Sequence, residues 1–185
     1  RDLGGYVGFD GRKIKMHRLL RTGKLCQMTK EDETFLLNYG LTKIIDLRSP
    51  KEIKITPDVI PAGVEHIDNP IHGNQSAETD QKIAQLKKTY TKDQYAGFKT
   101  MCHQYYSSVS QEYSQKAFRS LLNIFANTKD GAIIFHCSEG KDRTGLATVL
   151  ILYLLGVDME TIRQDYLFSN LMLGRYQAMM NQKII

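Results

Sequence analysis

The sequence contains no tryptophan, only four prolines and only three cysteines among its 185 residues. Three cysteines cannot all pair within one chain, and Cys26 and Cys102 could pair only if the fold brought them together. Free thiols in the core are the expectation. Every apolar run is shorter than the roughly 18 residues that a membrane-spanning helix needs. We therefore predict a chain without a membrane span.

The sequence also lacks a strong excess of positive or negative charge. The formal net charge is +5, and the lysines and arginines are scattered without interleaved aromatic residues, so no nucleic-acid partner is predicted. A weakly basic surface still attracts anionic substrates, and it allows transient contact with an anionic membrane surface. The length and the hydrophobic content of 42% are typical of one globular domain, which we expect to span residues 1–185.

The most informative stretch runs from residue 131 to residue 155. Residues 132–135 form a short apolar run, and residues 144–155 are apolar almost all round. This pattern predicts a buried strand and a buried helix joined by a polar loop. The loop then lies at a helix N-terminus, where unpaired backbone N–H groups and the helix dipole bind anions.

Cys137 and Arg143 stand six residues apart in this loop. That spacing lets the guanidinium grip two oxygens of a tetrahedral anion while the sulfur faces its central atom. Lys141, Arg143 and the helix N-terminus favour the thiolate, which can displace a leaving oxygen and form a phosphocysteine. Thr144 is expected to orient or stabilise the thiolate. The expected phosphate-binding residues are Ser138, Glu139, Gly140, Lys141, Asp142 and Arg143.

Residues 136–145, HCSEGKDRTG, resemble the signature loop HC-x5-R-[ST] of the Cys-dependent protein tyrosine and dual-specificity phosphatases. The inner GKDRTG is similar to that of the bacterial branch, some of whose members also act on phosphoserine, phosphothreonine and phosphoinositides. Residues 1–6, 44–49 and 165–170 fit the same branch. The resemblance implies hydrolysis of phosphate monoesters on a phosphorylated protein or a phosphoinositide, with neither a cofactor nor a metal.

The proton donor to the leaving group has two candidates. Many relatives in the wider superfamily supply an Asp from a Trp-Pro-Asp loop, which cannot exist in a chain without tryptophan. Asp142 precedes Arg143 at the rim of the loop, and we favour it as the general acid. Asp46, which follows a predicted strand beside Arg48, is the alternative, and this pair is equally well read as a buried network that supports the loop.

Patterns elsewhere predict the remaining elements. A hairpin is expected over residues 6–14, with a turn at Asp10-Gly11. Helices are expected from Thr29 to about Asn38, as three segments between residues 75 and 127 with Thr91 and Ser110 as caps, after Asp158, and from about residue 171. Strands are expected at residues 43–47 and 64–67. This order predicts an α/β fold, a small and mainly parallel sheet flanked by helices, with the signature loop following a central strand.

Other classes compete with the phosphatase interpretation. A catalytically silent module that binds phosphate or phosphoinositide would keep the anion site but not need Cys137. A sulfurtransferase or an arsenate reductase also uses a Cys in such a loop, although GKDRTG favours neither. The adjacent pairs Cys102-His103 and His136-Cys137 do not have the ligand spacing of structural zinc sites.

The chain begins within the stretch that resembles the family's opening motif, so any export signal, with a few N-terminal residues of the domain, would precede Arg1. Localisation in the cytoplasm and secretion are therefore both open.

Overall fold

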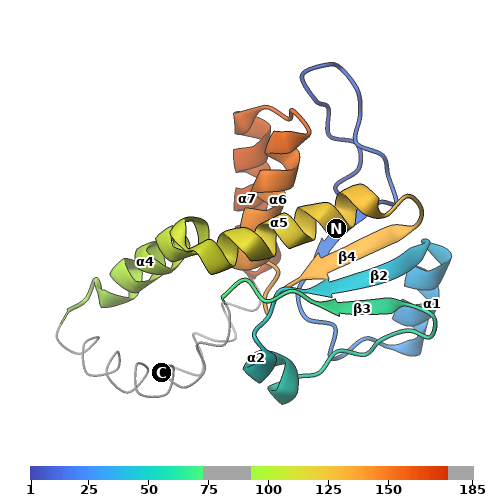
Figure 1. The fold of residues 1–185 in the computed structure, drawn as a ribbon, viewed down its shortest axis with the longest axis horizontal. Coiled ribbons are helices and arrows are strands. Elements are labelled where there is room, and N and C mark those ends of the chain that lie inside the picture. Colours follow the sequence, from blue (N-terminus) through green and yellow to red (C-terminus); the bar gives the residue numbers. More distant parts are fainter. Residues whose placement is uncertain (73–92, 175–185) are drawn as a thin grey trace.

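The computed structural model describes residues 1–72 and 93–174. Its centre is a four-stranded sheet of β1 (Leu19–Thr22), β4 (Ala132–His136), β2 (Leu41–Asp46) and β3 (Glu65–Asp68), in that spatial order (Figure 1). Every neighbouring pair of strands is parallel. The predicted α/β fold is confirmed, and the strand that precedes the signature loop, β4, lies inside the sheet.

Helices flank this sheet, and their bounds are α1 (Lys30–Asn38), α2 (Pro50–Ile55), α4 (Ala96–Ser110), α5 (Glu112–Asn127), α6 (Asp142–Leu154) and α7 (Met159–Met172). Helices α6 and α7 lie side by side, and α4 extends away from the sheet (Figure 1). Within the described ranges, none of these helices combines the length and the apolar character needed to cross a bilayer.

The core lies on both faces of β4 because successive side chains of a strand point to opposite sides. Ile133 and Phe135 pack with residues of α5 and α6, which include Leu121 and Ile151. Ala132 and Ile134 pack on the other face, where Leu36 of α1 covers them. Burial on both faces fixes the register of β4 against its neighbours and therefore the place where the signature loop begins.

Several sequence predictions are confirmed. Backbone hydrogen bonds close the 6–14 hairpin, and Gly11 lies at its turn with a φ of 77°. The strands at 43–47 and 64–67 appear as β2 and β3, shifted by one or two residues. Thr29 and Asp158 are the N-caps of α1 and α7.

Other predictions differ from the structure. Strand β1 and helix α2 were not predicted, because Leu19-Leu20 and the single short turn after Pro50 are too short to show a period. Gln111, rather than Ser110, is the N-cap of α5. Helix α7 continues through residue 171, where a new helix was expected. The helix expected at residues 75–90, the Thr91 cap and the chain after residue 174 lie outside the described residues.

The cap of α1 gives a test of local stability. Thr29 Oγ1 accepts from the backbone N–H of Asp32, and the Asp32 carboxylate accepts from the backbone N–H of Thr29. Thr29→Ala should therefore lower the free energy of unfolding by about 1 kcal/mol, measured by urea titration. Thr34→Ala is the matched control, because Thr34 is exposed inside the same helix, and it should change stability by less than about 0.5 kcal/mol. Equal effects would contradict the capping role.

Candidate active site

The signature loop connects the carboxyl end of β4 to the first turn of α6, as predicted. Cys137 directly follows the strand and is only 2% exposed. Lys141 is the N-cap of α6, and among residues 1–72 and 93–174 no side chain caps this helix end by a hydrogen bond. The backbone N–H groups of the first turn therefore have no capping side chain, which is the condition for an anion site.

Gly140 brings the loop against the end of β1. Its φ is +66°, and a Cβ atom there would lie 2.5 Å from the backbone oxygen of Thr22. Arg21 of β1 donates from Nη2 to the backbone oxygen of Gly140 at 2.8 Å. Because both the backbone conformation and the close approach require glycine, Gly140 fixes the path of the loop against the end of β1.

Arg143 is held by Glu52, a residue of α2. The guanidinium donates from Nη1 and Nη2 to the two carboxylate oxygens at 2.8 and 2.7 Å. Ser138 also donates from Oγ to Glu52 Oε1 at 2.6 Å. Burial would raise the pKa of Glu52, but the donors of Arg143 and Ser138 hold it well below its ordinary value. Glu52 therefore stays ionised and orients Arg143 within the loop.

Sequence reasoning missed Glu52, although a signal for its helix was present. Ser49 is the N-cap of α2, Pro50 opens the helix, and Glu52 is the third helical residue, so residues 49–52 form a capping box. The box turns the Glu52 carboxylate back towards Ser49. The same carboxylate then meets Arg143, a contact that depends on tertiary structure.

Asp165 of α7 supports the loop from another side. Its carboxylate accepts from Arg21 Nη1 at 2.8 Å, from Arg1 Nη2 at 2.6 Å and from Tyr6 Oη at 2.7 Å. Burial and the Asp165 carboxylate raise the pKa of Tyr6 to about 12. Arg21 thus connects Asp165 to the carbonyl of Gly140. The stretches at residues 1–6 and 165–170 therefore meet behind the signature loop.

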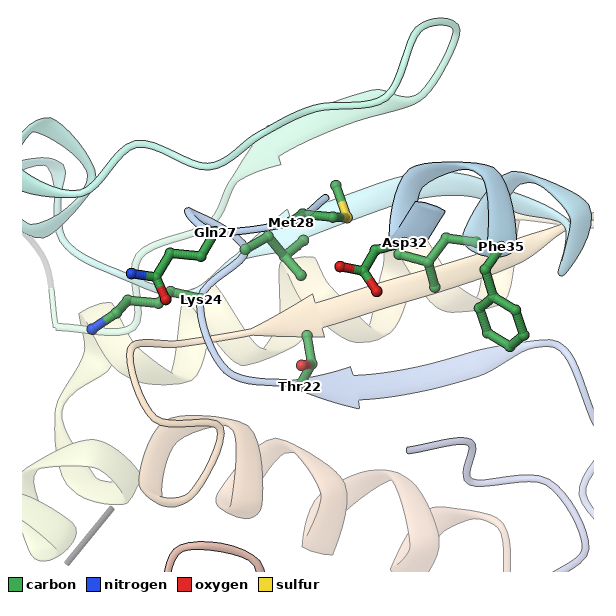
Figure 2. A pocket seen from close by; sticks show the side chains of 8 residues that line it. Thr22, Lys24, Gln27, Met28, Asp32 and Phe35 are labelled. Carbon is green, nitrogen blue, oxygen red and sulfur yellow. The ribbon is translucent and has the colours of Figure 1, made fainter. Parts of the chain in front are cut away.

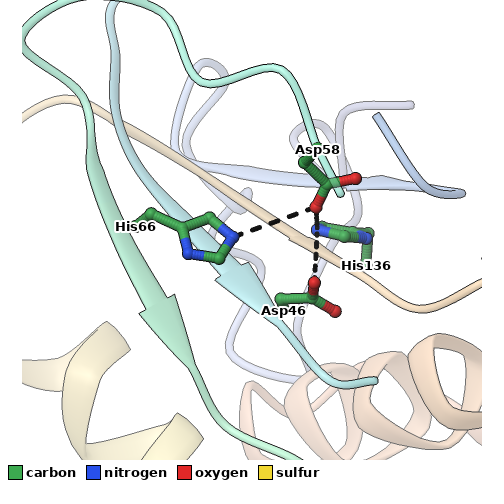
Figure 3. Close-up of side chains that lie close together, drawn as sticks. All are labelled: Asp46, Asp58, His66 and His136. Carbon is green, nitrogen blue, oxygen red and sulfur yellow. Dashed lines mark ion pairs between the residues drawn. The ribbon is translucent and has the colours of Figure 1, made fainter. Parts of the chain in front are cut away.

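A cluster of Asp46, Asp58, His66 and His136 lies behind Cys137, and we call it the acid–histidine cluster (Figure 3). His136 Nε2 lies 3.0 Å from Asp58 Oδ2, and its Nδ1 lies 3.2 Å from the backbone oxygen of Cys137. A carbonyl oxygen only accepts, so this Nδ1 carries a proton. His136 Nε2 makes no hydrogen bond within the described residues, so His136 lies between Asp58 and the backbone of Cys137 and is hydrogen-bonded only to the latter.

The donor atoms of the acid–histidine cluster lie within 4.8 Å of one another, close enough to surround a cation. However, Arg48 Nη2 donates to Asp46 Oδ2 at 2.6 Å and to Asp58 Oδ2 at 2.8 Å, so a guanidinium already pairs with both carboxylates. Asp46 and Arg48 are completely buried. The donor set fits a buried network around Arg48 better than a metal site.

The two candidate acids lie in different surroundings. Asp46 is fully buried, and both of its oxygens accept hydrogen bonds from Arg48. Asp142 is 37% exposed at the rim of the loop, with Lys141 Nζ 3.8 Å from its Oδ1.

Thr144 is fully buried, and its Oγ1 has no hydrogen-bond partner within residues 1–72 and 93–174. Its hydroxyl proton is therefore not used by a neighbouring protein group.

A groove with a volume of about 320 Å³ lies beside the signature loop (Figure 2). Its lining comes from β1, the following loop and α1, and includes Thr22, Lys24, Gln27, Met28, Asp32 and Phe35. Lys24 connects the groove to the signature loop, because its backbone N–H donates to the carbonyl of Ser138 at 3.2 Å. Lys24 Nζ also lies 3.8 Å from a carboxylate oxygen of Glu139.

Comparison with known proteins adds independent evidence. A relative from Cupriavidus necator, named as a candidate tyrosine-protein phosphatase, is 31% identical over 92% of this chain and 59% of its own length. The triple specificity protein phosphatase PtpB of Mycobacterium tuberculosis is 26% identical over 92% of this chain and 67% of its own length. A tyrosine-protein phosphatase of Nostoc commune is 29% identical over 84% of this chain and 49% of its own length.

The chain thus spans between about half and two thirds of the length of these relatives. The profile of the tyrosine phosphatase family, by contrast, matches it over residues 1–185. Because the match covers the whole chain, and the relative from Cupriavidus necator agrees with it, the chain belongs to the tyrosine phosphatase family.

Proposed function

We propose that this chain is a single catalytic domain that hydrolyses phosphate monoesters, phosphotyrosine in particular, through a phosphocysteine intermediate. The observation that carries this proposal is the pairing of Cys137 with an oriented Arg143 at the N-terminus of α6, which no side chain caps. The N–H groups and guanidinium bind the phosphoryl oxygens and stabilise the charge that develops on them in the transition state.

The first step transfers the phosphoryl group to the protein. The Cys137 thiolate attacks phosphorus, a sulfur–phosphorus bond forms, and the bond to the leaving oxygen breaks while Asp142 gives that oxygen a proton. In the second step a water molecule loses a proton to Asp142 and attacks phosphorus, and the thiolate leaves. Thr144, whose buried hydroxyl has no partner in the described residues, stabilises the departing thiolate.

Asp46 and Arg48 act as support in this mechanism. Neither oxygen of Asp46 reaches solvent, and both accept from Arg48, so the carboxylate is poorly placed to give a proton to a substrate. Through Arg48 and Asp58 the acid–histidine cluster reaches His136 and the backbone of Cys137.

The proposed substrate range extends to phosphoserine, phosphothreonine and phosphoinositides. Support comes from the GKDRTG sequence and from the name of the triple specificity relative. Lys141 adds a cation next to Arg143, more positive charge than one monoester requires. A headgroup with several phosphates gains more from this charge than phosphotyrosine does.

Replacing the nucleophile tests the covalent mechanism against a silent phosphate-binding module. Cys137→Ser should abolish hydrolysis of para-nitrophenyl phosphate, because a hydroxyl is a far weaker nucleophile at neutral pH. Binding of vanadate or phosphate should survive, since Arg143 and the loop backbone are unchanged. Steady-state kinetics and equilibrium binding measure the two properties. Near-normal turnover by the Ser variant would contradict the mechanism.

The dependence of kcat/KM on the leaving group distinguishes the two candidates for the general acid. Asp142→Asn should lose about 10²- to 10³-fold in kcat/KM on phenyl phosphate, a poor leaving group, and much less on para-nitrophenyl phosphate. Asp46→Asn should lose similar factors on both, because it weakens support of the loop rather than proton donation. If Asp46→Asn lost much more kcat/KM on phenyl phosphate than on para-nitrophenyl phosphate, and Asp142→Asn lost equal factors on both, Asp46 would be the acid instead of Asp142.

A comparison of two substrates tests the role of Lys141. Lys141→Met should reduce kcat/KM about ten-fold more on a soluble phosphoinositide than on a phosphotyrosine peptide, because one charge-assisted contact is lost. Lys116→Met, on an exposed lysine of α5, should change neither value. Equal fractional losses for Lys141→Met on both substrates would refute its part in headgroup recognition.

A further inference from the structure

Helix α4 contributes one side chain to the rim of the signature loop. Tyr105 is half-buried in a helix whose other aromatic side chains, such as Phe98 and Tyr106, are exposed. Its hydroxyl donates a hydrogen bond to Asp142 Oδ1, and it also contacts the hydroxyl of Tyr166 from α7. Two residues far from the signature loop in sequence therefore meet at the carboxylate of the proposed acid.

The direction of these hydrogen bonds follows from the groups involved. An ionised carboxylate only accepts, so the single hydroxyl proton of Tyr105 is directed to Asp142. The hydroxyl of Tyr166 must then donate to Tyr105. Burial and the Asp142 carboxylate raise the pKa of Tyr105 well above its ordinary value. Tyr105 consequently remains a donor at any pH at which a phosphatase works.

Tyr166 is itself fixed in place. A Cβ atom on Gly145 would lie 2.7 Å from a carbon of the Tyr166 ring, so the ring lies directly on the first turn of α6. Burial raises the pKa of Tyr166, Asp142 adds to the rise, and the contact with Tyr105 and the charge of Arg21 oppose it. The hydroxyl of Tyr166 therefore gives Tyr105 a fixed partner close to the catalytic loop.

The two oxygens of Asp142 are not equivalent. Tyr105 donates to Oδ1, and Lys141 Nζ lies 3.8 Å from the same oxygen. Within the described ranges of the chain, Oδ2 makes no hydrogen bond that would occupy it. When Asp142 is protonated, Oδ1 can continue to accept from Tyr105 while the proton resides on Oδ2.

We propose that Tyr105 is a positioning residue for the general acid, holding Asp142 by Oδ1 so that Oδ2 carries the proton to the leaving oxygen. This inference rests on the proposed role of Asp142. Tyr166 positions Tyr105 in turn. The groups that face Asp142 are then Lys141 from the loop, Tyr105 from α4 and, through Tyr105, Tyr166 from α7, with Arg21 acting on Tyr166.

Tyr105→Phe removes only the hydroxyl and therefore tests this role. At low pH, kcat/KM for phenyl phosphate should fall about ten-fold, and for para-nitrophenyl phosphate less than about two-fold. The loss should be selective for the poor leaving group, because the hydroxyl acts through the proton donor and not on the phosphoryl group itself. Tyr166→Phe should produce smaller changes in the same direction.

Tyr106→Phe is the matched control, because Tyr106 is the next residue of α4 and is 69% exposed. It should leave kcat/KM unchanged on both substrates. In an Asp142→Asn background, Tyr105→Phe should cause no further selective loss, as expected if the two groups act as one unit. Thermal unfolding of each variant checks that the fold is intact.

Three results would overturn the proposal, and they are distinguishable. Suppose that Asp142→Asn loses activity mainly on phenyl phosphate, but Tyr105→Phe behaves like Tyr106→Phe. The positioning role of Tyr105 is then wrong, while Asp142 remains the proposed acid. If Asp142→Asn reduces both substrates equally, the acid is another residue, and the role of Tyr105 falls with it. An equal fractional loss for Tyr105→Phe on both substrates would also overturn the positioning role.

Discussion

The paired hydrogen bonds between Glu52 and Arg143 are the interaction on which the candidate site depends. An arginine side chain alone would sample many rotamers, and fixing it in one geometry costs conformational entropy. The two hydrogen bonds from Arg143 to Glu52 offset this entropy loss when the protein folds. The capping box at Ser49 in turn orients Glu52. The guanidinium is therefore oriented before any phosphate binds, which is the preorganisation that electrostatic catalysis requires.

Two buried networks support the signature loop on which this pair acts. From the side of β1, Asp165 and Arg21 reach the carbonyl of Gly140. From the side of β2, Asp58 reaches the backbone of Cys137 through His136. Buried charges are costly unless they are paired, and removing one partner leaves the other uncompensated. The two networks therefore fix the position of the loop but add little to the net free energy of unfolding.

The sequence predicted those parts of the structure that local patterns determine. The apolar runs around residues 136–145 predicted β4, α6 and the loop between them, and Thr29 and Asp158 marked the starts of two helices. Strand β1 and helix α2 were missed because such short segments show no hydrophobic period. The roles of Glu52 and Tyr105 depend on tertiary contacts, so no local pattern could reveal them.

The proposed mechanism requires Cys137 to accept the phosphoryl group. Rapid denaturation of the enzyme during turnover of a phosphotyrosine peptide, followed by mass analysis of its fragments, detects this intermediate. The fragment containing Cys137 should gain the mass of one phosphoryl group, and the Cys137→Ser variant should show no such gain during the same period. Turnover with the phosphoryl group on another residue, or with no phosphorylated fragment at any time, would contradict it.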